Sequence, residues 1–334
     1  MSNFPEGKPM SAEIDNQPTD SAPLWRTSKP RTFWSDAAHS FSRNYTGMLG
    51  LLIFVLLLLA AIFANQIAPY DYLAQDWNNL LKPPNANHLM GTDELGRDVF
   101  SRVLMGARTA FLVALCISTI STTIGLFAGA LSALLGGWVD RVVVWIMDAL
   151  LSFPSIWLAA FVSVVTRPTI DSLTSGLYAS TGWAMFQDRV IFSYLVVIFA
   201  IGFVAWPYMG RLVRSQVLSL REKEFIEAAR ALGAGTRWVT IRHLIPNVLG
   251  SVIVTFTLSF GNAMLYESSL SFLGIGIQPP GASWGRMIFE ALGRLRAQPY
   301  LIIMPGLTLS LVVLSLQFVG DALNDALNPR SHSR

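Results

Sequence analysis

The sequence contains few charged side chains. Asp, Glu, Lys and Arg make up 13% of its 334 residues, about half of the share that soluble domains usually carry. The net charge is only +3, and the basic residues lie beside apolar stretches instead of forming one patch, which argues against nucleic-acid binding. Hydrophobic residues make up 52% of the chain, and the mean hydropathy is +0.47. This composition indicates a membrane protein.

Cysteine and catalytic motifs are also scarce. The chain has one cysteine, Cys116, which excludes a disulfide within the chain and a cysteine-based metal cluster. The histidines all lie outside the apolar stretches, at His39, His88, His243 and His332. No Gly-x-x-x-x-Gly-Lys-Ser/Thr motif is present, so the chain has no P-loop for ATP. We therefore expect no enzyme, no metal site and no cofactor in this chain.

Long apolar stretches are abundant. A helix needs about 20 residues to cross the hydrocarbon core of a bilayer, and it satisfies its own backbone groups there. The predicted spans are 48–64, 110–135, 142–165, 190–208, 248–274 and 300–319. The sequence therefore predicts an all-α membrane protein with six transmembrane helices.

The distribution of basic residues predicts the orientation. An even number of spans places both termini on one side of the membrane. Seven basic residues fall within 211–242 and others precede the first span, whereas the predicted outer loops (65–109, 166–189 and 275–299) hold nine over a much greater length. The positive-inside rule then places both termini in the cytoplasm.

The two ends of the chain differ from its apolar middle. Residues 1–32 are rich in Ser, Pro, Asp, Glu and Asn, which predicts a disordered cytoplasmic tail. Hydrophobic residues recur at helical spacing in 33–46; this favours a helix in the headgroup layer, with a continuation of the tail as the alternative. The six-span domain is predicted to cover 47–324, and a cytoplasmic C-terminus 325–334.

The segment 211–246, between the fourth and fifth predicted spans, is too long for a tight turn. An apolar stripe at helical spacing runs through Phe225, Ala228, Ala229 and Leu232. Gly233 can end such a helix, because glycine adopts the left-handed conformation without strain. A second helical piece is expected to stop at Pro246. Pattern alone leaves two interpretations open, a helix that docks in another protein and a solvated hairpin.

The same segment resembles a known motif. The pattern Glu227-Ala228-Ala229, then Gly233, then His243-Leu244-Ile245-Pro246-Asn247 is similar to the EAA motif of importer-type ABC permeases. In that family the segment is the coupling helix, which sits in a cleft of an ATPase subunit. The resemblance implies that the ATPase-coupling residues are Phe225, Glu227, Ala228, Ala229, Leu232, Gly233, His243 and Pro246.

Four further stretches extend this resemblance, at 88–108, 148–154, 266–285 and 320–329. Together they resemble the second, C-type permease of the dipeptide/oligopeptide/nickel class of ABC transporters. The resemblance implies the type I importer permease fold in a bacterial inner membrane and a heterodimer with a sister permease. It also implies two ATPase subunits, which bind ATP and Mg²⁺, and an external solute-binding protein.

The outer stretch before the second predicted span is rich in charge. Thr92 or Asp93 is predicted to cap a helix that carries Leu95, Val99 and Val103 on one face. The charged residues expected to face water or a partner are Asp93, Glu94, Arg97, Asp98 and Arg102. Asp93, Glu94, Arg97 and Asp98 would contact the solute-binding protein; alternatively, the helix only covers the end of the bundle.

Two acids fall inside predicted spans, where a charge is costly and usually functional. Asp148 is expected to pair with a neighbouring basic group, with Arg141 about two turns away on an ideal helix, and to lock packing. Glu267, with Asn262 and Ser268, would line the substrate pathway and attract an ammonium group. Alternatively, Glu267 would anchor a bend at the glycines that follow it.

Glycine and proline within the spans are expected to act structurally. Glycines that would let helices approach closely are Gly125, Gly129, Gly202 and Gly261. Prolines that would favour kinks are Pro154, Pro207 and Pro305.

The side chains in the predicted spans limit which cargoes are possible. Nickel would favour His or Cys ligands along the pathway, and a sugar would favour stacked aromatics with carboxamides. The predicted spans contain no histidine and are aliphatic.

The class of transporter is a separate question. A secondary transporter would show two related halves, and no convincing repeat is found. We therefore predict ATP-driven import of short peptides by alternating access. Nickel, opines, glutathione and oligosaccharides remain the alternatives within the family.

Overall fold

The computed structural model describes residues 33–327. Within that range no strand occurs, and six helices are long and apolar enough to cross a membrane: Tyr45–Ile62, Val99–Leu135, Ser155–Thr181, Val190–Arg221, Thr240–Phe272 and Tyr300–Leu327. The predicted all-α fold with six transmembrane helices is confirmed. The predicted tail, 1–32, and the positions 328–334 of the predicted C-terminus lie outside the described residues.

The long helices are α2 (Tyr45–Ile62), α4 (Val99–Leu135), α6 (Ser155–Thr181), α7 (Arg189–Arg221), α10 (Ile245–Phe272) and α12 (Tyr300–Leu327). The shorter helices are α1 (Phe33–Ser42), α3 (Ala64–Ile67), α5 (Gly137–Leu151), α8 (Glu224–Ala231), α9 (Thr236–Val239) and α11 (Trp284–Ala291). Single turns complete the set: η1 (Ala184–Gln187), the π-helical turn η2 (Thr240–Leu244) and η3 (Leu292–Arg294).

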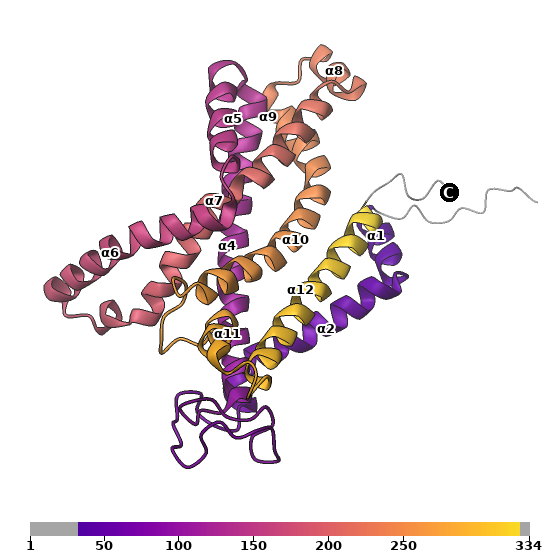
Figure 1. Ribbon diagram of the computed structural model, residues 1–334. Helices are drawn as coiled ribbons and strands as arrows, with labels where there is room; N and C mark the ends of the chain where they lie inside the picture. Colours follow the sequence, from indigo (N-terminus) through magenta and orange to yellow (C-terminus); the bar gives the residue numbers. More distant parts are fainter. Residues whose placement is uncertain (1–32, 328–334) are drawn as a thin grey trace, which may run out of the picture.

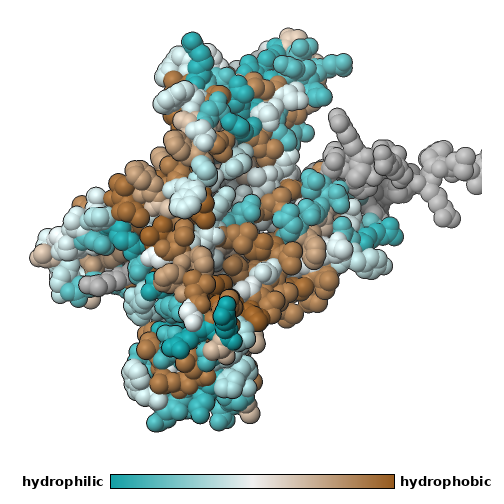
Figure 2. Space-filling view, in the orientation of Figure 1, coloured by the Kyte–Doolittle hydropathy of each residue, from teal (hydrophilic) through white to brown (hydrophobic). Residues whose placement is uncertain are grey.

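Helix α4 forms the central axis of the molecule, and α7 packs along it (Figure 1). The pair α2 and α12 projects to one side, with α1 against α12, and α6 projects to the other. We call the end that carries α5, α8 and α9 the inner end, and the opposite end, with the chain between α3 and α4, the outer end. Hydrophilic residues gather at both ends and hydrophobic residues between them (Figure 2), as expected of a protein that crosses a bilayer.

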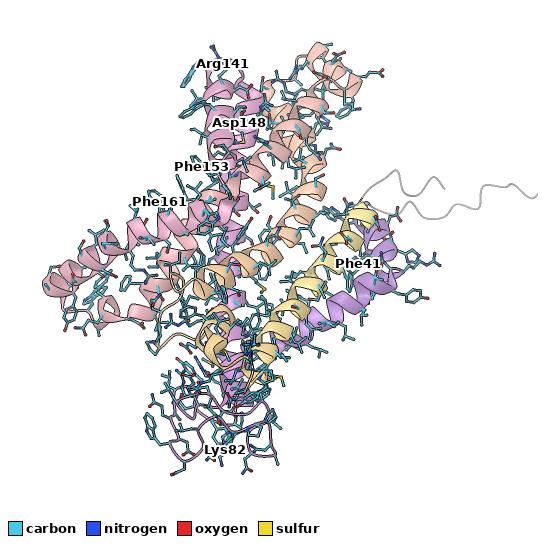
Figure 3. The ribbon with its side chains drawn as sticks, viewed as in Figure 1. Phe41, Lys82, Arg141, Asp148, Phe153 and Phe161 are labelled. Carbon is cyan, nitrogen blue, oxygen red and sulfur yellow. The ribbon has the colours of Figure 1, made fainter. Side chains whose placement is uncertain are left out.

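The third predicted span, 142–165, is wrong. Helices α5 and α6 are separated by a break at 152–154, and Asp148 lies on α5 before this break (Figure 3). Pro154 precedes α6 in a non-helical conformation, with φ −58° and ψ 121°. The helix breaks here because a proline has no N–H to donate the hydrogen bond that would continue α5. Asp148 is therefore outside the membrane-spanning helix, and most of the predicted outer loop 166–189 is helix.

Three other spans are longer than predicted. The predicted bounds stopped beside Arg108, Arg211 and Asp321, the charged residues that interrupt the apolar stretches. Helices α4, α7 and α12 continue past these positions. Hydropathy detects only the apolar part of a helix, and the backbone stays helical where charged side chains interrupt that part. Pro207 and Pro305 lie inside α7 and α12, as predicted.

The most extensive helix contact joins α4 to α7. A Cβ atom on Gly125 would lie 2.6 Å from the Met209 Cβ, and one on Gly129 would collide with the backbone of α7. The predicted close approach is thus confirmed at these two glycines. At Gly202 a Cβ would have a tight contact of 3.3 Å with α4. At Gly261 it would make only ordinary van der Waals contacts, so close approach is not required there.

Replacing Gly125 by Ala should destabilise the protein. The added methyl group forces α4 away from α7, and overpacking of this kind costs about 1–3 kcal/mol. The matched control is Gly306→Ala on α12, where a Cβ meets nothing within 4 Å. Thermal unfolding in detergent, followed by tryptophan fluorescence, should show a lower Tm for Gly125→Ala and an unchanged or higher Tm for Gly306→Ala. Equal Tm values would contradict the close contact.

Candidate functional site

Helix α8 at the inner end is closed by a glycine in the left-handed conformation. Gly233 has φ +88°. Its N–H donates to the Arg230 carbonyl at 2.9 Å, and the Ala234 N–H donates to the Ala229 carbonyl at 3.0 Å. These two bonds form a Schellman motif, which satisfies carbonyls that the helix end would leave unpaired. The helix end predicted at Gly233 is confirmed.

The apolar residues of α8 are divided between two faces. Ile226 is fully buried and belongs to a cluster with Met209 and Leu244. Phe225 is 46% exposed and Leu232 is 89% exposed. Ala229 is partly buried, whereas Glu227 and Ala228 are exposed. Ile226, which the predicted stripe left out, therefore anchors α8, and the stripe itself offers two large apolar side chains to a partner.

Aromatic side chains continue this exposed surface. The ring of His243 lies 5.0 Å from Trp238 and 5.9 Å from Phe225, measured between centroids. Trp238 is 52% exposed, and the sequence pattern did not single it out. The predicted stop at Pro246 is wrong, because η2 continues directly into α10 and Pro246 lies in the first turn of that helix.

Ion pairs hold α5 against α7 beneath α8. The Asp140 carboxylate accepts from Arg214 Nε at 2.6 Å and Nη2 at 2.8 Å, and also from the Ser132 hydroxyl. Hydrogen bonds from Arg214 and Ser132 lower the pKa of Asp140 to about 2. Asp148 pairs with Arg211 at 2.5 Å. The predicted pairing of Asp148 is confirmed, but its partner comes from another helix.

At the outer end, two of the acids expected to face water are buried. Asp98 is 3% exposed; it caps α4 by accepting from the Ser101 N–H at 2.8 Å, and it contacts His88 Nδ1 at 3.0 Å. Asp93 is 7% exposed. The expectation that these carboxylates face water is therefore wrong, and so is a cap at Thr92 or Asp93.

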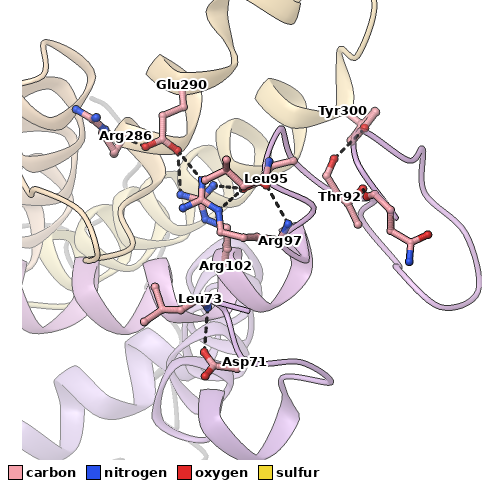
Figure 4. Close-up of polar contacts among 11 residues, drawn as sticks. Asp71, Leu73, Thr92, Leu95, Arg97, Arg102, Arg286, Glu290 and Tyr300 are labelled. Atoms are coloured by element: carbon pink, nitrogen blue, oxygen red, sulfur yellow. Dashed lines mark hydrogen bonds and ion pairs between the residues drawn. The ribbon is translucent and has the colours of Figure 1, made fainter. Parts of the chain in front are cut away.

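Asp93 belongs to a network of charged groups that joins the outer segment to α11 (Figure 4). It pairs with Arg97 at 2.7 Å and with Arg102 at 2.6 Å, and these two arginines pair with Glu290 of α11 at 3.3 and 3.0 Å. Arg286 adds a third contact to Glu290 at 3.0 Å. Burial alone would raise the pKa of Glu290, but the arginines lower it below its usual value.

Arg102, expected to face water, is thus buried too, whereas Arg97 is partly accessible and Glu94 is exposed. Glu94 pairs with Arg294 at 2.9 Å. Of the four residues predicted to contact a binding protein, Glu94 and Arg97 keep accessible surface. No sequence pattern indicated Glu290, because its partners Arg97 and Arg102 lie almost two hundred positions earlier in the chain.

Glu267 of α10 is completely enclosed. Its carboxylate accepts from the hydroxyls of Ser271 and Ser283 at 2.8 Å and from Ser268 at 3.3 Å. Ser283 lies directly before α11. The Glu267 carboxylate therefore holds the start of α11 against α10. In this structure Glu267 anchors a bend, and Ser268 is buried beside it, whereas Asn262 is exposed.

The residues after Ser283 complete this connection. Trp284 is fully buried, and its Nε1–H donates to the Val103 carbonyl of α4 at 3.0 Å. Gly285 lies so close to the backbone of Ser268 that a Cβ would collide with its carbonyl. The predicted motif 283–285 therefore joins α11 to α4 and α10.

Comparison with known families and proteins gives consistent matches. Residues 121–333 match the family described as binding-protein-dependent transport system inner membrane component, and residues 32–84 match the N-terminal TM domain of oligopeptide transport permease C. A solved structure, titled as inward-facing conformations of a methionine ABC transporter, shares the fold. Its TM-score is 0.50 at 20% identity, with 68% of this chain and 96% of that chain covered.

Curated relatives are similar over most of their length. A dipeptide transport system permease protein of Alkalihalophilus pseudofirmus is 35% identical over 90% of this chain and 91% of its own. An oligopeptide transport system permease protein of Bacillus subtilis is 35% identical, with the same coverage of 90% and 91%. A glutathione transport system permease protein of Escherichia coli is 36% identical over 92% of this chain and 94% of its own.

Replacing Glu267 by Ala should lower thermal stability. The hydroxyls of Ser271 and Ser283 would lose their acceptor in an enclosed site, at about 1–3 kcal/mol for each unpaired group. Glu267→Gln keeps one carbonyl oxygen as an acceptor, so its Tm should fall between those of the wild type and Glu267→Ala. Glu94→Ala, which removes an exposed pair at the same end, should cost less than about 1 kcal/mol. A Tm for Glu267→Ala as high as that for Glu94→Ala would show that the carboxylate does not hold the bend.

Proposed function

This chain belongs to the family of binding-protein-dependent transport system inner membrane components, and from that membership we propose that it carries short peptides into the cytoplasm. It is a C-type ABC importer permease of the dipeptide, oligopeptide and glutathione group. It would act beside a sister permease, with two ATPase subunits and an external solute-binding protein, in the inner membrane of a bacterium. Both termini and α8 would lie in the cytoplasm.

The exposed surface of α8 supports this proposal most directly. Phe225 and Leu232 are exposed, whereas Ile226 packs α8 against apolar residues of α7. The ion pairs of Asp140 and Asp148 fix α5 to the same helix. A partner that moves α8 would therefore move α7 with it. We infer that nucleotide binding draws the ATPase subunits together and turns the cavity between the permeases outward, and that hydrolysis lets it open inward. The chain itself performs no chemistry.

The relatives also support a peptide as cargo. Their names specify dipeptides, oligopeptides and glutathione, which all contain amide bonds. The candidate spans hold no cluster of side chains suited to nickel, since His88 and His243 lie at opposite ends of the molecule. Glutathione is the second candidate, because the relative named for it is similar over 92% of this chain.

Uptake by cells that carry only this transport system tests the cargo. Radiolabelled di- to hexapeptides should accumulate in an ATP-dependent manner, and glutathione should compete if it is also carried. Nickel and oligosaccharides should not accumulate. Accumulation of either of these without peptide would contradict the proposed function.

A charge on the exposed surface of α8 should uncouple the permease. Leu232→Glu should lower copurification of the ATPase subunits, because a carboxylate would be buried unpaired in their cleft, a cost of several kcal/mol. The fold should be unaffected, since Leu232 is 89% exposed. The matched control is Leu89→Glu at the outer end, where the leucine is 60% exposed and ATPase retention should equal the wild type. Normal retention and uptake by Leu232→Glu would exclude α8 as the coupling helix.

A further inference from the structure

One face of α10 is polar over almost its whole length. Its members recur every three or four residues, the spacing that aligns side chains on one side of a helix. They are Ser251, Thr255, Ser259, Asn262, Tyr266 and Ser269, of which Tyr266 also packs against the hydrophobic core. None is charged, and none is buried. The first and last are about 27 Å apart along the axis, close to the thickness of the hydrocarbon core.

The core of the protein lies on the other side of α10. Phe260, Met264 and Glu267 are buried there, and on an ideal helix they point more than about 90° away from Asn262. The polar face is therefore the side of α10 that the described residues leave accessible.

The hydroxyls of this face are not satisfied within their own helix. A hydroxyl that faces lipid usually donates to the carbonyl one turn back. Thr257, on a different face of α10, donates to the Ile253 carbonyl at 3.0 Å. Among the described residues, Thr255, Ser259 and Asn262 have no side-chain hydrogen-bond partner. Lipid would leave these groups unpaired, so their position favours contact with water or a polar ligand.

The polar face opens into a hollow at the inner end. This hollow has a volume of about 660 Å³ and lies between α7, α10 and α12, with α1 at its edge. Its polar lining is uncharged: Gln216, Asn247, Ser251 and Asn324. Gln216 Nε2 donates to the Ser251 hydroxyl at 2.8 Å, which ties the hollow to the first residue of the polar face. A volume of this size can hold a small ligand.

We propose that the polar face of α10 and this hollow form the wall of the peptide path in this subunit, and that they bind the peptide backbone. Hydroxyl and carboxamide groups both donate and accept hydrogen bonds, as backbone N–H and C=O groups require. Since the wall carries no charge, it does not select among peptides by the charge of their side chains. This inference rests on the proposed peptide cargo. Of the residues predicted from the sequence to line the pathway, Asn262 is therefore retained. Glu267 and Ser268 are not, because they are buried on another side of α10.

Cysteine labelling of the complete transporter in membrane vesicles tests the position of the wall. Cys116→Ala removes the single cysteine of this chain, and Ser259→Cys and Asn262→Cys then report on the polar face. Thr257→Cys is the matched control on another face of the same helix. The charged, water-soluble reagent 2-(trimethylammonium)ethyl methanethiosulfonate should label the first two about tenfold faster than the control, because the reactive thiolate forms only where water reaches it. A transported pentapeptide should slow that labelling.

Each alternative gives a different result. Slow labelling of Ser259→Cys and Asn262→Cys, with or without peptide, would overturn the wall, because the face would then be covered by the sister permease or by lipid. Fast labelling that peptide does not slow, in vesicles that do import the peptide, would overturn backbone binding. If wild-type vesicles import no peptide, the proposed function fails, whereas fast labelling of the two variants would still support a water-lined path.

A charge placed on the wall tests its neutrality. Asn262→Asp should raise the uptake ratio of a lysine-containing to a glutamate-containing peptide by roughly threefold or more over wild type, the effect of a partly screened charge. Asn262→Gln, which keeps a carboxamide, should leave the ratio unchanged. An unchanged ratio in Asn262→Asp would overturn the assignment of this residue to the peptide path.

Discussion

The contact between α4 and α7 determines how the two ends of this protein are related. Gly125 and Gly129 bring the two helix backbones together, and neither helix can shift far without losing that packing. The outer charged network includes Arg102, on the first turn of α4, and the inner helix α8 follows closely after α7. The two ends are therefore joined through one closely packed pair of helices.

The two ends are stabilised by different physical means. At the outer end, three arginines pair with two carboxylates at low exposure, and Glu267 with its serines fixes the chain that leads into α11. At the inner end, Ile226 and an apolar cluster hold α8 while Phe225, Trp238 and Leu232 stay exposed. Directional bonds suit a surface that keeps its shape, whereas an apolar surface suits one that closes on a partner.

Local features of the chain were predictable, and long-range ones were not. The number of spans and the helix end at Gly233 follow from hydropathy and from backbone conformation, which depend on neighbouring residues. The third span failed because apolar residues continue across Pro154, so that hydropathy alone could not show the break. The burial of Asp93 and Asp98 was missed because no spacing reveals their surroundings. The arginines that pair with Asp93 also bind Glu290 of a distant helix, and Asp98 contacts His88. Glu267 was found as an intramembrane acid, but its acceptor role depends on Ser283, sixteen positions later.

The contact of Trp284 with Val103 spans 181 positions of the chain, and this separation has a consequence for biosynthesis. Helix α4 leaves the ribosome long before α11 exists, so its outer turn enters the membrane with Arg102 lacking Glu290 and with the Val103 carbonyl lacking its indole donor. Only synthesis of the last third of the chain supplies both partners. A truncated or stalled product therefore presents Arg102 at the outer end with only one of its two carboxylate partners, Asp93.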